Sequence, residues 1–286
     1  MPTKVILFFA LFIFIAAMPK DAYQLYNKEG KTTTYEQLLK QAADADIVLF
    51  GELHNNPICH WLQLELTSEL FEKVGKNLTL GAEMFETDNQ LLLNEYLNGL
   101  ISRKSFEEEA RLWKNYTTDY KPLVEFAKTN QLPFIATNIP RRYASAVFNN
   151  GIEHLQQLSP QAQQFIAPVP FEIDITLPGY QAMLQMGGHG TANSQNMPKA
   201  QAAKDATMAH FILQNWKKGK LFVHFNGAYH SNHYEGIVWY LKKQNPNLRI
   251  ITISSVEQSD INSLLPDNLQ LADFIICTPE KMTKTH

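Results

Sequence analysis

The sequence predicts an α/β fold, in which a mostly parallel sheet carries helices on both faces and a helical or irregular flap. Short, wholly apolar runs alternate with amphipathic helical segments along almost the whole chain, as in a parallel sheet that is covered on both sides. One stretch, residues 166–198, interrupts this alternation, because it contains four of the fourteen prolines and has no clean hydrophobic period.

Each expected element has a local justification. A helix over residues 32–41 is capped by Thr34, with Gln37 completing a capping box. The helix over 57–75 has Pro57 in its first turn and Gly75 at its end. Further helices are expected over residues 89–98, 105–114, 120–130, 141–151, 199–219 and 233–243. Strands are expected over residues 45–52, 77–85, 133–140, 220–225, 248–254 and 272–277.

Length and charge limit the function classes. After a leader at residues 1–18, the remaining residues 19–286 suit a single α/β domain, with the flap at about 141–204. The net charge is −3 and no long basic stripe is present, which argues against nucleic-acid binding. The sequence leaves open whether Cys59 and Cys277 form a disulfide or stay as two buried thiols.

The leader is expected from an uncharged apolar run at residues 5–17, behind Lys4. Thirteen residues are short for a membrane span, which needs about 20, and fit the apolar region of a secretory signal peptide. Cleavage near Ala17 or Met18 is expected, with an uncleaved anchor as the alternative. The protein is therefore expected to be exported and to be periplasmic or membrane-associated. No cysteine follows the run to accept a lipid.

Two Gly-x-x-His elements follow expected strands, and two glutamates lie at strand ends nearby. Because ligands collect beyond the carboxyl ends of parallel strands, these side chains are expected to converge on one edge of the sheet. Two histidines with carboxylates suit either a divalent metal such as zinc or acid–base catalysis. The bland alternative is that each histidine is a hydrogen-bonded structural residue. The residues concerned are Gly51, His54, Gly227 and His230, with Glu52 and Glu83.

The remaining histidines of these stretches are expected to have no role in binding or catalysis. His224 lies inside an expected strand and is expected to be structural. His60 and His233 fall in the first turns of helices and are expected to be caps or surface groups.

The flap carries a different chemistry. Tyr143 stands beside Arg141 and Arg142 at a helix start, and Tyr180 lies in an LPGY segment. Haem needs apolar cover, one iron ligand and cations for its propionates, and a tyrosinate favours ferric iron. The alternative is that a methionine-rich helix with a tyrosine simply belongs to the core. Methionines, a histidine and lysines follow along the flap, namely Met183, Met186, His189, Met197, Lys199 and Lys204.

Four motifs together resemble the ChaN haem-binding uptake proteins, within the wider Tiki/TraB and erythromycin-esterase-like superfamily. They are FGELHNNP, GAEMFE, the MGGHG…AQAAKDATMAHFI run and NGAYHSNHYEGI, and the resemblance covers about residues 34–278. It implies an exported bacterial protein of haem-iron acquisition, with an outer-membrane haem receptor system as its partner.

The resemblance also implies a site. Haem is expected between two subunits of a homodimer, with a tyrosine of one subunit on the iron and a histidine and a lysine of the other on the propionates. The tyrosine is Tyr143, the first choice, or Tyr180. The partner groups are His154 or His189, and Lys199 or Lys204.

Two functions therefore remain open. The first is haem binding without catalysis, which depends on the tyrosines and the flap. The second, as in hydrolytic members of the superfamily, is a metal-dependent or metal-free hydrolase. It would use Glu52, His54, Glu83 and His230, with the metal on His54, His230 and Glu83.

Overall fold

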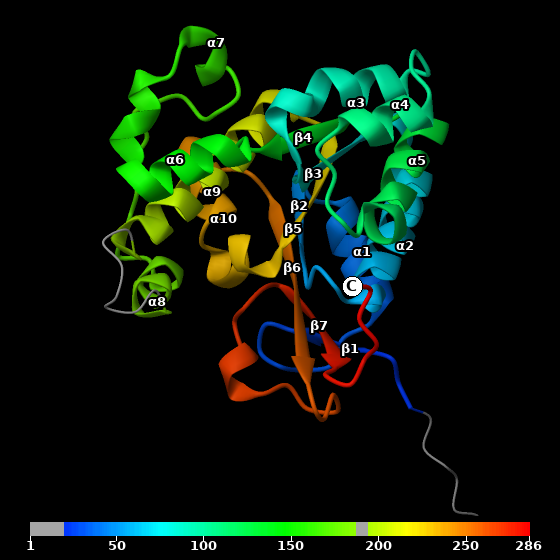
Figure 1. Ribbon diagram of the computed structural model, residues 1–286. Helices are drawn as coiled ribbons and strands as arrows, with labels where there is room; N and C mark the ends of the chain where they lie inside the picture. The colour runs from blue at the N-terminus through cyan, green and yellow to red at the C-terminus, as the bar shows by residue number, and fades with distance from the viewer. Residues whose placement is uncertain (1–19, 187–193) are drawn as a thin grey trace, which may run out of the picture.

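The computed structural model describes residues 20–186 and 194–286, and shows one seven-stranded sheet between two helical layers (Figure 1). The expected leader at 1–18 and His189 lie outside the described residues. The strand order is β1-β7-β6-β2-β5-β3-β4, and every neighbouring pair is parallel except β1 with β7. The strands are β1 Gln24–Asn27, β2 Ile47–Glu52, β3 Leu78–Glu86, β4 Phe134–Asn138, β5 Leu221–Gly227, β6 Ile250–Gln258 and β7 Phe274–Pro279.

The helices of the chain's first half cover one face of the sheet (Figure 1). They bury leucines and aromatic side chains against β2, β3 and β5 in the largest apolar core. They are α1 Tyr35–Ala43, α2 Pro57–Val74, α3 Gln90–Leu97, α4 Arg103–Glu109 and α5 Lys121–Thr129.

The helices of the second half lie on the opposite side (Figure 1). Alanines and Ile212 of α9 pack with α10 against the other face of the sheet, and α6 packs on α9. They are α6 Arg141–Asn150, α7 Pro160–Gln163, α8 Pro178–Met186, α9 Met197–Asn215 and α10 Ile237–Gln244. The expected flap thus includes two helices, α6 and the start of α9, that belong to the layer over the sheet.

Two elements differ from the expectation. The antiparallel edge strand β1 was not expected, since four residues give too short a pattern, and its pairing partner β7 lies at the other end of the chain. The helix expected at 233–243 begins only at Ile237. Gly236 interrupts it with a φ of +51°, and a Cβ there would lie 2.4 Å from the carbonyl oxygen of His230.

Cys59 and Cys277 are both buried free thiols. Within the described residues, no helix is both long and apolar enough to cross a membrane.

Candidate functional site

The carboxyl ends of β2, β3 and β5 meet at one edge of the sheet (Figure 1). Because β2 and β5 are parallel with Glu52 opposite Gly227, the loops that follow them leave the sheet side by side. The structure accordingly brings His54, Glu83 and His230 into one pocket, while Glu52 lies beneath it, away from the lining.

His54 is held by Glu52. Its Nδ1 donates a 2.8 Å hydrogen bond to a carboxylate that is fully buried, whereas the imidazole itself is 39% exposed. The tautomer that donates from Nδ1 leaves Nε2 available on the pocket side. Burial opposes the charged ring, but the hydrogen bond to Glu52 and the charge of Glu83 together raise the pKa of His54 above its ordinary value.

Three further side chains contact Glu52 from below. The Tyr120 hydroxyl donates to it at 2.7 Å, Gln63 donates from its amide, and His60 lies 3.8 Å from its second oxygen. The expectation that His60 is a helix cap or a surface group is therefore wrong. It is buried, because the first turn of α2 packs beneath the strand edge and not against solvent.

His230 lies between two buried carboxylates. Its Nδ1 is 2.5 Å from Asp205 and its Nε2 is 3.1 Å from Glu83, which also accepts the Gly227 amide at 2.8 Å. With an acceptor at both nitrogens, the ring is a protonated donor. Burial opposes that charge, but the two carboxylates raise the pKa of His230 to about 9. Burial raises the pKa of Glu83, but the charge and hydrogen bond of His230 outweigh burial and hold this pKa well below its usual range.

The glycines of the two Gly-x-x-His elements allow close approach. A Cβ on Gly227 would lie 2.8 Å from His54 Nε2, so the imidazole can rest on β5 only because this position has no side chain. A Cβ on Gly51 would lie 2.9 Å from the Cα of Ala228. The repeated motif therefore packs each histidine loop against the neighbouring strand.

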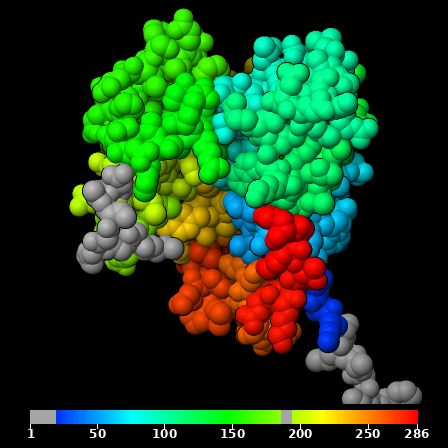
Figure 2. Space-filling view, in the orientation of Figure 1, coloured from blue at the N-terminus to red at the C-terminus, as the bar shows by residue number. Residues whose placement is uncertain are grey.

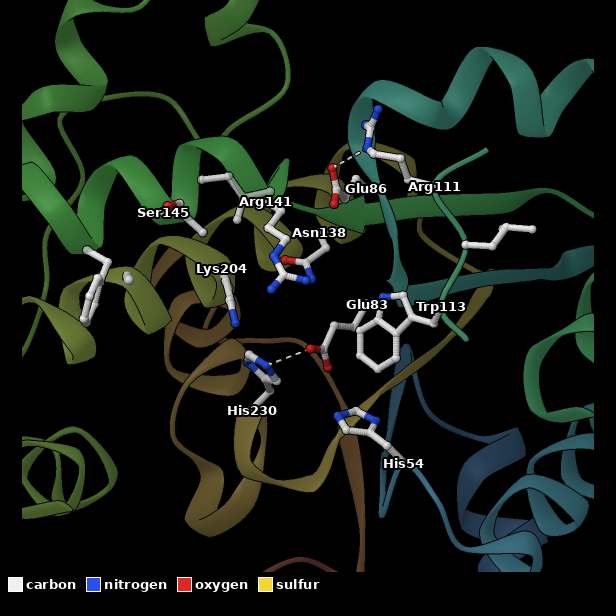
Figure 3. Close-up of a pocket in the computed structure, with 15 residues that line it drawn as sticks. His54, Glu83, Glu86, Arg111, Trp113, Asn138, Arg141, Ser145, Lys204 and His230 are labelled. Carbon is white, nitrogen blue, oxygen red and sulfur yellow. Dashed lines mark hydrogen bonds and ion pairs between the residues drawn. The ribbon is translucent and has the colours of Figure 1, made fainter. Parts of the chain in front are cut away.

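The pocket has a volume of about 760 Å³, which is within the ~300–1,000 Å³ range of small-molecule sites. Residues of α6 and residues that follow α4 line opposite sides of the pocket, and Figure 2 shows the green and teal parts of the chain that contain them adjoining each other. Trp113 forms an apolar wall, with its ring 4.9 Å from that of His54 and edge-on to it. Figure 3 shows Arg141 and Lys204 extending into the same space above Glu83 and His230.

His224 is structural, as expected: it is buried and pairs with the Thr137 hydroxyl at 2.7 Å and with Asn226 at 3.1 Å. Among residues 20–186 and 194–286, no group of three or more His, Cys, Asp or Glu side chains is arranged to hold a metal ion.

The tyrosines expected to bind haem lie outside this pocket. Tyr180, on α8, is buried, and its hydroxyl donates to Asp205 at 2.7 Å. Burial and the Asp205 charge raise its pKa far above the ordinary value. Tyr143, on α6, is half-buried, and its hydroxyl accepts from Arg142 at 3.2 Å, with the guanidinium 4.4 Å from the ring centroid.

The expected partners of haem are spread along the second half. Lys204 lines the pocket from α9, and Lys199 lies five residues earlier on the same helix. His154 lies in the short helix Ile152–Gln157 that follows α6.

Sequence reasoning missed Asp205, Trp113 and Tyr120. Asp205 is the buried carboxylate that completes the His230 pair, and a single acid among the alanines of residues 200–209 was a usable signal for it. Trp113 and Tyr120 come from the segment between α4 and α5, where no motif marked them.

Comparison with known proteins gives a consistent picture. A family model described as "Haem-binding uptake, Tiki superfamily, ChaN" matches residues 38–241. ChaN of Campylobacter jejuni, whose structure is described as showing cofacial heme binding, has a TM-score of 0.67 at 16% identity, over 89% of this chain and 96% of that one. At this identity the likeness shows the fold.

A mutant of the erythromycin esterase EreC in its open conformation gives a TM-score of 0.49 at 12% identity, over 86% of this chain and 93% of that one. No curated protein sequence matches the chain.

Proposed function

Because the chain belongs to the ChaN family of haem-binding uptake proteins in the Tiki superfamily, we propose that it binds ferric haem during bacterial iron uptake. The proposed iron ligand is Tyr143, and the proposed site lies between two copies of the chain after export. The observation that carries the choice of ligand is the contrast between the two candidate tyrosines.

Tyr180 is poorly placed to ligate haem iron. Its hydroxyl is buried and engaged with Asp205, so iron ligation would break a 2.7 Å hydrogen bond and leave a buried carboxylate short of a partner. Tyr143 is half-buried on α6, and its oxygen already faces the Arg142 guanidinium. That cation lies beside the oxygen that would carry negative charge as an iron ligand.

The geometry supports two subunits over one. Tyr143 and Arg141 are two positions apart on α6, which is about 200° around a helix, so Tyr143 faces away from the pocket that Arg141 and Lys204 line. A haem on Tyr143 would therefore meet Lys199 or Lys204, and His154, from a second copy. Haem supplies the iron and two propionates. Tyr143 would ligate the iron, and the lysine and histidine of the second copy would pair with the propionates.

A haem titration followed by absorbance tests the proposal. The parent chain should give a high-spin ferric spectrum with a phenolate signature, and sedimentation should show a shift from monomer to dimer as haem is added. Tyr143→Phe should remove the signature and weaken binding by more than about tenfold, since even neighbours of a metal ligand are worth ~10–100-fold in affinity.

Tyr180→Phe and Tyr229→Phe are the matched controls. Tyr229 is an exposed tyrosine whose hydroxyl donates to the Gly179 carbonyl. Both variants should keep the parent spectrum. If Tyr143→Phe binds haem as the parent does, while His54→Ala fails, the iron sits on the strand-end histidine and Tyr143 is not its ligand.

The pocket supports hydrolysis as a second candidate function. The specific observation is the His54–Glu52 pair, in which a buried carboxylate fixes the tautomer and leaves Nε2 facing the pocket. An imidazole so held can take a proton from water, and the adjacent protonated His230 can donate one. Ester turnover that is abolished by His54→Ala and retained in Tyr143→Phe would favour this function over haem binding.

A further inference from the structure

Arg141 and Lys204 are two cations that line the strand-end pocket and have no carboxylate partner in the described part of the chain. The other charged groups around the pocket are paired. Arg111 bonds Glu86 at 3.0 Å and also Asp88, and His230 lies between Glu83 and Asp205. Arg141 and Lys204 are therefore the two cations of the lining that a bound anion can pair with.

A third side chain in the same wall lacks a partner. Asn138 ends β4 and is only 9% exposed, yet its Oδ1 is buried without a hydrogen bond. An unmade hydrogen bond at a buried polar atom costs about 1–3 kcal/mol, so such an atom is expected to meet a ligand or water. In Figure 3 Asn138 lies with Arg141 and Lys204 around the hollow above Glu83 and His230.

Large apolar side chains also line the pocket, alongside its charged and polar residues. Trp113 and Leu112 come from one side, and Ile139 and Phe148 from the other. A ligand with a flat or apolar body would therefore be covered while its charged end meets the cations.

We propose that this pocket binds an organic anion. Its carboxylate or phosphate pairs with Arg141 and Lys204, a hydroxyl or amide next to that group donates to Asn138, and its apolar part lies on Trp113. Arg141 and Asn138 have no part in the proposed tyrosine site, and Lys204 is the one residue that the two proposals share. Two kinds of ligand carry such a group: haem, through one of its propionates, and a free small molecule.

Isothermal titration of the full chain with three probes tests this. Phenylacetate and phenyl phosphate carry the anion and a ring, and mandelate adds the neighbouring hydroxyl. Arg141→Met and Lys204→Met should each weaken all three by about tenfold or more, as expected for loss of a charge-assisted hydrogen bond. Asn138→Ala should remove any preference for mandelate over phenylacetate.

Arg103→Met on α4 and Lys40→Met on α1 are matched controls, since each is an exposed cation that neither lines the pocket nor takes part in the proposed haem site. They should bind like the parent. The proposal is overturned if the parent binds none of the three probes, or if the pocket variants and the controls bind them equally. A thermal melt of each variant ensures that only folded protein is compared.

A haem titration of the same variants identifies the source. Weaker haem binding in both Arg141→Met and Lys204→Met places a propionate in the pocket. Unchanged haem binding beside lost probe binding assigns a free small anion. A parent that binds the probes and not haem ends the tyrosine proposal and leaves this one standing.

Discussion

The strand-end edge and the outer side of α6 hold their charged groups in opposite ways. At the edge, Glu83, Asp205 and His230 are all buried and each one compensates another. On α6, Arg142 and Tyr143 form a contact at the surface, and the Arg142 side chain is 48% exposed. Buried charges depend on their partners for stability, whereas exposed ones are solvated and screened. A substitution among the buried charges of the edge is therefore expected to lower the stability of the fold along with any function. A substitution at Arg142 or Tyr143 is expected to change binding with little effect on stability.

The largest expected effect breaks the edge. His230→Ala leaves two buried carboxylates facing each other without a cation, and should destabilise the fold by about 3–5 kcal/mol. Urea unfolding measures this. His154→Ala, at a half-buried histidine of the short helix Ile152–Gln157, is the control and should change stability by less than about 0.5 kcal/mol. Equal effects of the two variants would contradict the comparison.

The second prediction concerns pH. The folded-state pKa of His230 is about 9, above the ordinary 6.5, so its contribution to stability is full below pH 6.5 and is lost as the pH rises through 9. The raised pKa of His54 acts in the same direction. Stability should fall by about 3 kcal/mol between pH 6.5 and 9, because each unit of the pKa shift is worth about 1.4 kcal/mol and most of the shift is lost over this range.

Denaturant midpoints across this range measure the slope. The His230→Gln variant lacks the titrating group and should show a flatter profile. A parent profile as flat as that of the variant would show that the ring is neutral in the folded protein.

The smallest expected effect on stability concerns Tyr143, on the outer side of α6. Tyr143→Phe removes a hydroxyl that only accepts from an exposed arginine, so the unfolding free energy should change by less than about 0.5 kcal/mol. The same variant should lose haem. Urea unfolding and haem titration of one preparation measure both, and a destabilisation as large as that of His230→Ala would mean that Tyr143 belongs to the core.

Local pattern determined most of the fold. Six of the seven strands and the helices that cover them follow from apolar runs, caps and glycine stops, because each signal lies within about ten residues. The exception, β1, depends on pairing with β7 at the far end of the sequence. The positions of His54, Glu83 and His230 at one edge followed from topology, since parallel strands end on the same side.

Tertiary structure alone decided what those residues do to one another. Glu52 and Tyr120 are 68 residues apart and Glu83 and His230 are 147 apart, so no spacing in the sequence reveals their contacts. Burial then sets the chemistry, because a carboxylate removed from water must find a cation or a donor. The same holds for Arg141 and Tyr143: the sequence places them together, and only the packing of α6 turns one into the pocket and the other away from it.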